Sequence, residues 1–113
     1  MAIQVTITPA LFEEISDTFK GDAIRIVDFI YSLKKSPHKG KALGNVGGTL
    51  IKELKYKSFR FYFITDGFKL RCLGKNVIVD ILFRFVRMSN KNNQKEIIKE
   101  IRKVLLEIGS QGL

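Results

Sequence analysis

The chain has very little of the chemistry that most metal and redox sites require. Its 113 residues include one cysteine, Cys72, one histidine, His38, and no tryptophan. A single cysteine excludes an internal disulfide, and one cysteine with one histidine falls short of a structural zinc site. The sequence also has no P-loop, no Ser-His-Asp ordering, and no carboxylate pair or Asp/His cluster for metal-assisted hydrolysis. We therefore expect no metal and no cofactor.

Long apolar runs are also missing. No segment is apolar enough to span a membrane, and no signal peptide opens the chain. These absences predict a cytoplasmic protein with no membrane partner. The length suits one domain, residues 1–113, with one hydrophobic core. A hydrophobic fraction of 45% and an aromatic fraction of 11% are too high for a disordered chain.

Acidic residues are scarce relative to basic ones. Eleven Asp and Glu stand against 20 Lys and Arg, so the net charge is +9 and the pI is about 9.9. A small domain this basic usually binds a polyanion, which means DNA, RNA, an anionic membrane or an acidic protein. The alternative is that the charge only maintains solubility. The cations cluster in the second half of the chain, and this favours a polyanionic partner.

The N-terminal part of the sequence predicts one strand and two helices. Residues 2–7 alternate between apolar and polar, which is typical of a strand. Thr8 and Pro9 then form a helix start, with Thr as the N-cap and Pro at the first helical position. Gly21 ends this helix, and a second follows over residues 22–36. The two helices should form an antiparallel hairpin.

After a glycine-rich loop over residues 37–49, the period of the sequence changes from helical to β. Asp66-Gly67 is a typical two-residue hairpin turn, and Asn93 with Glu96 resembles a capping box before a last helix. The isoleucine stripe of that helix is expected to be core rather than an interaction groove. The predicted strands are 50–56, 59–65, 68–73 and 77–87. The order predicts an α+β fold, with an N-terminal helical hairpin packed on a twisted antiparallel sheet of four to five strands, and a C-terminal helix.

The strand over residues 59–65 has two chemically different faces. Phe59, Phe61 and Phe63 alternate with Arg60 and Tyr62, so the phenylalanines should pack on the helices while the other two share the opposite face. A positive sheet face that carries a tyrosine suits single-stranded nucleic acid, because cations hold phosphates and an aromatic ring stacks on a base. The alternative is a solvated sheet face with scattered cations.

The same residue types suit metal-free cleavage of RNA. In that reaction the ribose 2′-hydroxyl attacks the next phosphorus, charge grows on the phosphoryl oxygens, and the 5′-oxygen leaves. Arginine holds phosphate in a bidentate manner and stabilises that charge. A Lys or Tyr with a lowered pKa is the expected acceptor of the 2′-hydroxyl proton.

Two motifs resemble those of a known family. Gly48-Thr49-Leu50-Ile51-Lys52-Glu53-Leu54-Lys55, followed by Phe59-Arg60-Phe61-Tyr62-Phe63-Ile64, is similar to the core motif of RelE/ParE-type toxins. Phe83-Arg84-Phe85-Val86-Arg87-Met88-Ser89-Asn90-Lys91, followed by Gln94-Lys95-Glu96-Ile97, is similar to the ending of the HigB, or phage Gp49-like, branch. The resemblance covers most of the chain and implies a RelE-like fold.

The resemblance also implies a function. Members are toxins of type II toxin–antitoxin pairs, and many cleave messenger RNA in the ribosome without a metal. The expected partners are a cognate antitoxin, the ribosome and mRNA, with operator DNA bound only through the antitoxin complex. By position, the catalytic residues would be Arg60, Lys55, Arg87 and Lys91. The expected RNA-binding residues are Tyr62, Tyr56, Lys57, Arg84 and Arg71.

The sequence departs from the family pattern in two places. Arg84 stands where the family often has histidine, which removes one candidate acid or base. The stretch from Asp66 to Phe85 is longer than the usual hairpin, which weakens the assignment of Arg87. Two alternatives to an endoribonuclease therefore stay open: a non-catalytic nucleic-acid-binding module on the same fold, and a ParE-like poison of DNA gyrase.

Overall fold

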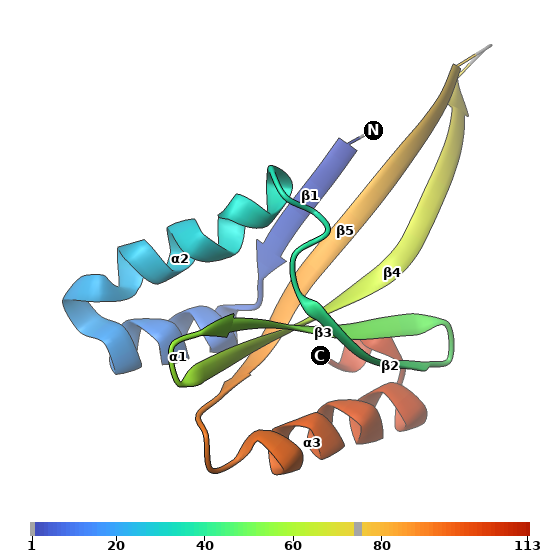
Figure 1. The fold of residues 1–113 in the computed structure, drawn as a ribbon. Coiled ribbons are helices and arrows are strands. Elements are labelled where there is room, and N and C mark those ends of the chain that lie inside the picture. Colours follow the sequence, from blue (N-terminus) through green and yellow to red (C-terminus); the bar gives the residue numbers. More distant parts are fainter. Residues whose placement is uncertain (1, 74–75) are drawn as a thin grey trace.

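The computed structural model describes residues 2–73 and 76–113, and the side chains of residues 3–65 and 82–113. Its architecture is an α+β fold with an N-terminal helical hairpin, a five-stranded sheet and a C-terminal helix, as predicted (Figure 1). The elements are β1 (Ala2–Ile7), α1 (Pro9–Phe19), η1 (Lys20–Asp22), α2 (Ala23–Tyr31), η2 (Ser32–Lys34), β2 (Lys41–Val46), β3 (Thr49–Tyr56), β4 (Phe59–Leu73), β5 (Asn76–Ser89), α3 (Gln94–Glu107) and η3 (Ser110–Gly112).

The sheet is mostly antiparallel. Its strand order is β1-β5-β4-β3-β2, and only the β1–β5 pair among these neighbours is parallel. Parallel neighbours need a long connection, whereas antiparallel ones can follow a tight turn. The helical hairpin and three further strands lie between β1 and β5 in the chain and supply that connection. The result is a sheet with β1 at one edge and β2 at the other.

Two strand predictions were wrong. Residues 41–46, expected in a loop, form the edge strand β2, which pairs with β3 through a register shift between Ala42 and Gly44. Asp66-Gly67, expected to be a hairpin turn, lies inside the single strand β4. A register shift between Thr65 and Phe68 absorbs these two residues against β5, in the manner of a β-bulge.

The helix starts follow the predicted signals in part. The Thr8 hydroxyl accepts a hydrogen bond from the backbone N–H of Leu11 (3.3 Å), and Pro9 is the first residue of α1, as predicted. Asn93 stands at the N-cap of α3, but its side-chain oxygen instead accepts from the backbone N–H of Asn90 (2.9 Å). The predicted capping box is therefore not formed, and Asn93 holds the connection between β5 and α3.

Each face of the sheet carries its own apolar core. The α1–α2 hairpin covers one face, and α3 covers the other. The first core contains Val5, Leu11, Ile15, Ile26, Ile30, Leu33, Leu54, Phe61, Phe63, Phe83, Phe85 and Met88. The second contains Ile51, Tyr62, Ile64, Val86, Ile97, Ile101 and Leu105, so the isoleucine stripe of α3 is core, as expected.

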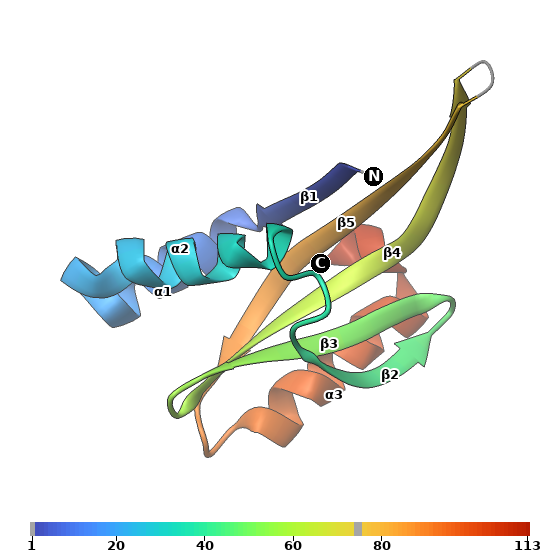
Figure 2. The ribbon, with the colours of Figure 1, turned by 45° about the horizontal axis from the view of Figure 1, so that its top comes forward.

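The β4–β5 hairpin extends beyond the rest of the sheet. β3 pairs only with residues 59–65 of β4, whereas residues 68–73 of β4 pair with residues 76–81 of β5. Figures 1 and 2 show this hairpin projecting away from the helices. It accounts for the elongated shape of the molecule, which measures 48 × 32 × 22 Å. The four predicted catalytic residues lie toward the opposite end of these strands.

Candidate nucleic-acid interface

Two of the predicted catalytic cations lie side by side on neighbouring strands. Lys55 of β3 is directly opposite Arg60 of β4, in the second residue pair from the turn that joins the two strands. Lys55 is exposed and Arg60 is partly buried. Residues directly opposite in an antiparallel pair have their Cβ atoms only about 5 Å apart. We call Lys55 and Arg60 the basic pair, because their two charges can reach one phosphate group together.

The other two predicted catalytic cations lie at the same end of the sheet. Arg60 is also opposite Ser89, the last residue of β5, and Lys91 follows two residues later as an exposed side chain. Arg87 lies on β5 opposite Tyr62, one step along the same face from Arg60 and Ser89. The structure thus brings Lys55, Arg60, Arg87 and Lys91 to the same end of the sheet, three of them on β3, β4 and β5 and Lys91 just after β5.

Arg87 already has an acidic partner. Its guanidinium lies 2.8 Å from the carboxylate of Glu100 on α3, and the two side chains are 37% and 46% exposed. At that exposure an ion pair contributes only about 0–1 kcal/mol to stability. A phosphate group that approached Arg87 would therefore compete with Glu100 for the guanidinium, at a small energetic cost.

Tyr62 does not lie on an open surface, contrary to the prediction. Its side chain is fully buried, because α3 covers this face of the sheet and packs Ile101 and its neighbours over the ring. The Tyr62 hydroxyl lies 2.7 Å from the hydroxyl of Ser89, which is itself buried. Burial raises the pKa of Tyr62, and the hydrogen bond with Ser89 partly offsets that rise. The ring is therefore not positioned to stack on a base in this structure.

Tyr56 and Lys57 follow the basic pair residue Lys55 in the chain, but the Tyr56 ring faces the other side of the sheet. The ring of Tyr56 packs against Phe29 of α2, with 5.1 Å between the ring centroids, and so faces the helical hairpin. Lys57, in the turn between β3 and β4, has φ of 54° and places its Nζ 5.6 Å from the centroid of the Tyr56 ring. The Tyr56 ring therefore lies on the opposite face of the sheet from Arg60, and Lys57 extends over that ring.

Arg84 is also distant from the basic pair. It lies opposite Ile64, four residues along β4 from Arg60, which corresponds to about 13 Å in a strand. Its guanidinium donates a long hydrogen bond (3.5 Å) to the backbone oxygen of Ser110, near the C-terminus. The expectation that Arg84 joins the same RNA surface is thus not supported by its position. The side chain of Arg71 lies outside the described residues.

Glu14 is a residue that the sequence did not single out. It lines a small cavity of about 130 Å³ between α1 and the end of β5, together with Phe59, Ser89 and Asn90 among others. Burial raises the pKa of the Glu14 carboxyl, and the nearby Arg87 partly lowers it. In the sequence Glu14 is one of several acids on the polar side of α1, so no pattern distinguishes it from Glu13.

Neither a metal-binding cluster of side chains nor a membrane-spanning helix is found among the described residues. Among the side chains of residues 3–65 and 82–113, no group of three His, Cys, Asp or Glu residues could hold a metal ion. No helix in the part of the chain that the structure describes is long and apolar enough to cross a membrane.

Comparison with known proteins supports the RelE-like fold. No family model matches the sequence, and no curated protein matches it. A chain in the crystal structure of an archaeal RelE-RelB complex from Pyrococcus horikoshii OT3 is similar to this structure, with a TM-score of 0.56 and 13% sequence identity. The similarity covers 81% of this chain and 98% of that one.

A likeness at 13% identity concerns the fold alone. The protein therefore has a RelE-like fold, as the sequence motifs implied. The finer assignment to the HigB branch stays a prediction, and so do the roles of the individual cations.

Proposed function

We propose that this protein is the toxin of a type II toxin–antitoxin pair and acts as a ribosome-dependent, metal-independent mRNA endonuclease. The observation that carries the proposal is the basic pair, Lys55 and Arg60, at one end of a RelE-like sheet. Arg87 and Lys91 lie at the same end and extend the positive charge toward α3. This arrangement suits a phosphodiester that carries negative charge.

The proposed reaction is an internal transfer within the RNA. The 2′-hydroxyl oxygen forms a bond to the adjacent phosphorus, and the bond from that phosphorus to the 5′-oxygen breaks. The 2′ proton passes to a base, and a proton is delivered to the leaving 5′-oxygen, which gives a 2′,3′-cyclic phosphate and a 5′-hydroxyl. Arg60 stabilises the charge that develops on the phosphoryl oxygens, and Lys55, Arg87 and Lys91 hold the backbone phosphates.

The structure changes which residue is the better candidate for proton transfer. The raised pKa of Tyr62 and its burial make it a poor base. Glu14 lines the same small cavity as Ser89, which is opposite Arg60, and its raised pKa brings the carboxyl closer to the pH at which a general base is effective. Glu14 is therefore our candidate for the group that accepts the 2′-hydroxyl proton.

The proposed partners follow from the same function. A cognate antitoxin would neutralise the basic end of the sheet, and the ribosome would present the mRNA in the cytoplasm. Operator DNA would be bound only through the complex with the antitoxin. The structural neighbour comes from a RelE-RelB complex, which is consistent with a protein partner for this fold.

The test is induced expression in a bacterial host, with growth and transcript cleavage followed together. The wild type should arrest growth and cut translated messages, whereas Arg60→Ala should lose about 100-fold or more of the cleavage rate. Arg25→Ala is the matched control, because Arg25 is an exposed arginine on α2, away from the basic pair. If both variants and the wild type grow alike while well folded, the toxin proposal fails.

The same samples distinguish the two alternatives. Salt-sensitive RNA binding without cleavage, in the presence of ribosomes, would indicate a non-catalytic binding module. Inhibition of DNA supercoiling by purified protein would indicate a gyrase poison.

A further inference from the structure

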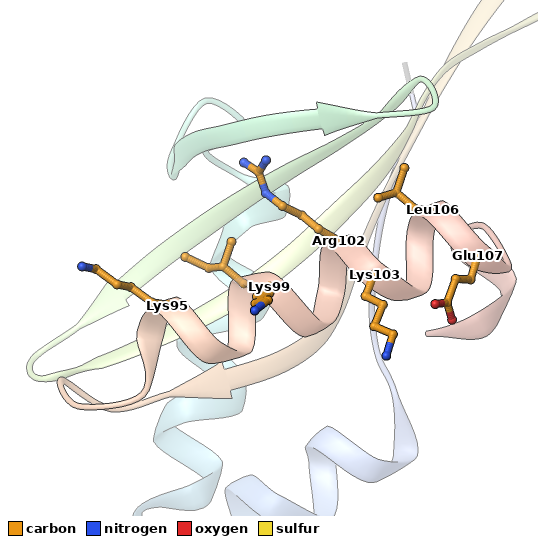
Figure 3. A pocket seen from close by; sticks show the side chains of 7 residues that line it. Lys95, Lys99, Arg102, Lys103, Leu106 and Glu107 are labelled. Carbon is orange, nitrogen blue, oxygen red and sulfur yellow. The ribbon is translucent and has the colours of Figure 1, made fainter.

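The outer face of α3 carries a stripe of side chains that the proposed reaction does not use. Lys95, Lys99, Arg102 and Lys103 lie on it with Ile98 and Leu106, around a surface hollow of about 530 Å³ (Figure 3). These residues recur at intervals of three and four, so they form one continuous face of the helix. We call these six residues the α3 stripe. The buried side chains of α3, Ile97, Ile101 and Leu105, are not part of this stripe.

The shape of the α3 stripe suits another helix. From Lys95 to Leu106 it runs along the helix axis for about 17 Å, at about 1.5 Å per residue. Leu106 is 76% exposed although it is a large apolar side chain, and the partly buried Ile98 connects the stripe to the core beneath. Ile98 and Leu106 are about two helical turns apart, and apolar side chains repeated along one helix face are the pattern by which amphipathic helices pack against one another. A small ligand would not need contacts over this length.

The charge of the stripe defines the chemistry of the partner. Four cations border the hollow, and among the described residues Glu107 is the one acid that lines it. An acidic helix would therefore be attracted, and its leucines would cover Leu106 and Ile98. Within the described part of the chain the lining contains no aromatic ring on which a base could stack, so these residues favour a peptide over single-stranded RNA.

The edge of the sheet contributes to the same surface. Arg102 extends from α3 toward β2, and its Nη2 donates a hydrogen bond to the backbone oxygen of Leu43 (2.9 Å) (Figure 3). Gly44 has φ of 155°, and a Cβ atom there would lie only 2.7 Å from Nη2 of Arg102. The absence of a side chain at Gly44 thus lets Arg102 link the stripe to the edge strand, which holds the cationic border in place.

We propose that the α3 stripe binds an acidic amphipathic helix of a partner protein. The proposal rests on the proposed function in one respect, because that function would identify the partner as the antitoxin. Binding at the stripe would leave the basic pair open, so it would act as an anchor beside the segment that neutralises the site.

The test uses a designed, fluorescein-labelled helical peptide of roughly 18 residues, about 27 Å long as a helix, with leucines at helical spacing and glutamates elsewhere. A scrambled peptide of the same composition is the control. Fluorescence anisotropy with the full chain should detect binding of the first peptide and not the second. Leu106→Glu should weaken binding about tenfold or more, since it adds an acid and removes an apolar anchor. Lys99→Glu with Lys103→Glu should weaken it as well.

Ile24→Glu is the matched control variant. Ile24 is also 76% exposed and lies on α2, so an exposed apolar side chain is again replaced by an acidic one, away from the stripe. This variant should bind the peptide as the wild type does. Loss of binding in Ile24→Glu to the same extent as in Leu106→Glu would overturn the proposal, and so would equal binding of both peptides.

Two further outcomes assign the stripe to another occupant and also overturn the proposal. Oligouridine is titrated in the same assay, and binding that depends on Lys99 and Lys103 but not on Leu106 indicates RNA. A dimer in gel filtration that Leu106→Glu dissolves indicates a second copy of the chain. Peptide binding is measured without ribosomes or cleavage, so its failure is distinguishable from failure of the Arg60→Ala test.

Discussion

The two faces of the sheet are held by different chemistry. Against the helical hairpin the contacts are apolar and rich in aromatic rings. Phe63 is stacked on Phe85, with 4.6 Å between the ring centroids, and lies edge-to-face with Phe83, with 5.5 Å between the ring centroids. Against α3 the buried residues are mainly aliphatic, and polar contacts supplement them. They include the Tyr62–Ser89 hydrogen bond, the Arg87–Glu100 ion pair and the hydrogen bond from Arg102 to the backbone oxygen of Leu43.

The difference indicates that the two faces have separate tasks. We expect ring packing on the hairpin side to contribute most to the stability of the fold, because large buried side chains bury the most apolar surface. The α3 side carries the basic pair, and its polar contacts tie the helix to cations and hydroxyls near that pair. Substitutions on the first face should therefore lower the free energy of unfolding most, whereas those on the second should lower it less and also change binding.

The largest effect is expected from Phe63→Ala. The ring is fully buried between Phe83 and Phe85, so its removal leaves a cavity and should lower the free energy of unfolding by about 3–5 kcal/mol. Urea denaturation followed by circular dichroism measures it. A loss below about 1 kcal/mol would show that the hairpin face is not the main source of stability.

Tyr62→Phe should have an intermediate effect on the other face. It leaves the buried Ser89 hydroxyl without its 2.7 Å partner, which costs about 1–3 kcal/mol in the free energy of unfolding. Adding Ser89→Ala removes the second polar group and should restore part of the loss. If the loss of unfolding free energy in the double variant is as large as the summed losses of the two single variants, or larger, the hydrogen bond is not the cause.

The elements of the fold that the sequence did not predict are those fixed by distant partners. The segment Lys41–Val46 contains Gly44 and has weak alternation, yet it becomes a strand because β3 offers a free edge. Asp66-Gly67 is locally a turn signal, but pairing of β4 with β5 on both sides of it outweighs that preference. Local patterns describe one segment at a time, and both results depend on a second segment.

The part of the candidate site that could be predicted from the sequence is the part fixed by the alternation of side chains along the strands. The motif around Lys55 and Arg60 placed both cations in adjacent strands, and the structure pairs them directly. The periodicity of α3 also predicted its apolar stripe, but periodicity does not say which surface a helix covers. Tyr62 was therefore expected on an open face and is instead buried under α3. Glu14 depends on how α1 meets the end of β5, which no local pattern records.

Glu100→Gln should change the free energy of unfolding less than Tyr62→Phe does, and its main effect should be on the affinity for RNA. Loss of the partly exposed ion pair should cost at most about 1 kcal/mol of unfolding free energy. Arg87 would then be free for phosphate, so the affinity for oligouridine should rise several-fold at low salt. Glu107→Gln is the control, because it changes the net charge by the same amount on the same helix. Equal affinity gains in the two variants would attribute the effect to net charge alone.

The smallest effect on the free energy of unfolding is expected from Glu14→Gln, and its size depends on pH. Burial raises the pKa of Glu14 above its ordinary value of 4.5, so the folded state favours the protonated carboxyl. That contribution to stability is fully present below pH 4.5 and is lost as the pH rises through the raised pKa. A glutamine side chain at this position mimics the protonated carboxyl. The variant should therefore be more stable than the wild type at about pH 7, by less than about 1 kcal/mol because solvent reaches the group.

The difference in the free energy of unfolding between Glu14→Gln and the wild type should vanish at about pH 4, where the wild-type carboxyl is mostly protonated as well. Chemical denaturation at both pH values measures it. Arg87 acts in the opposite direction to burial, because its positive charge favours the ionised carboxyl. A wild type that is more stable than the variant at neutral pH would therefore mean that Arg87, rather than burial, dominates the environment of Glu14.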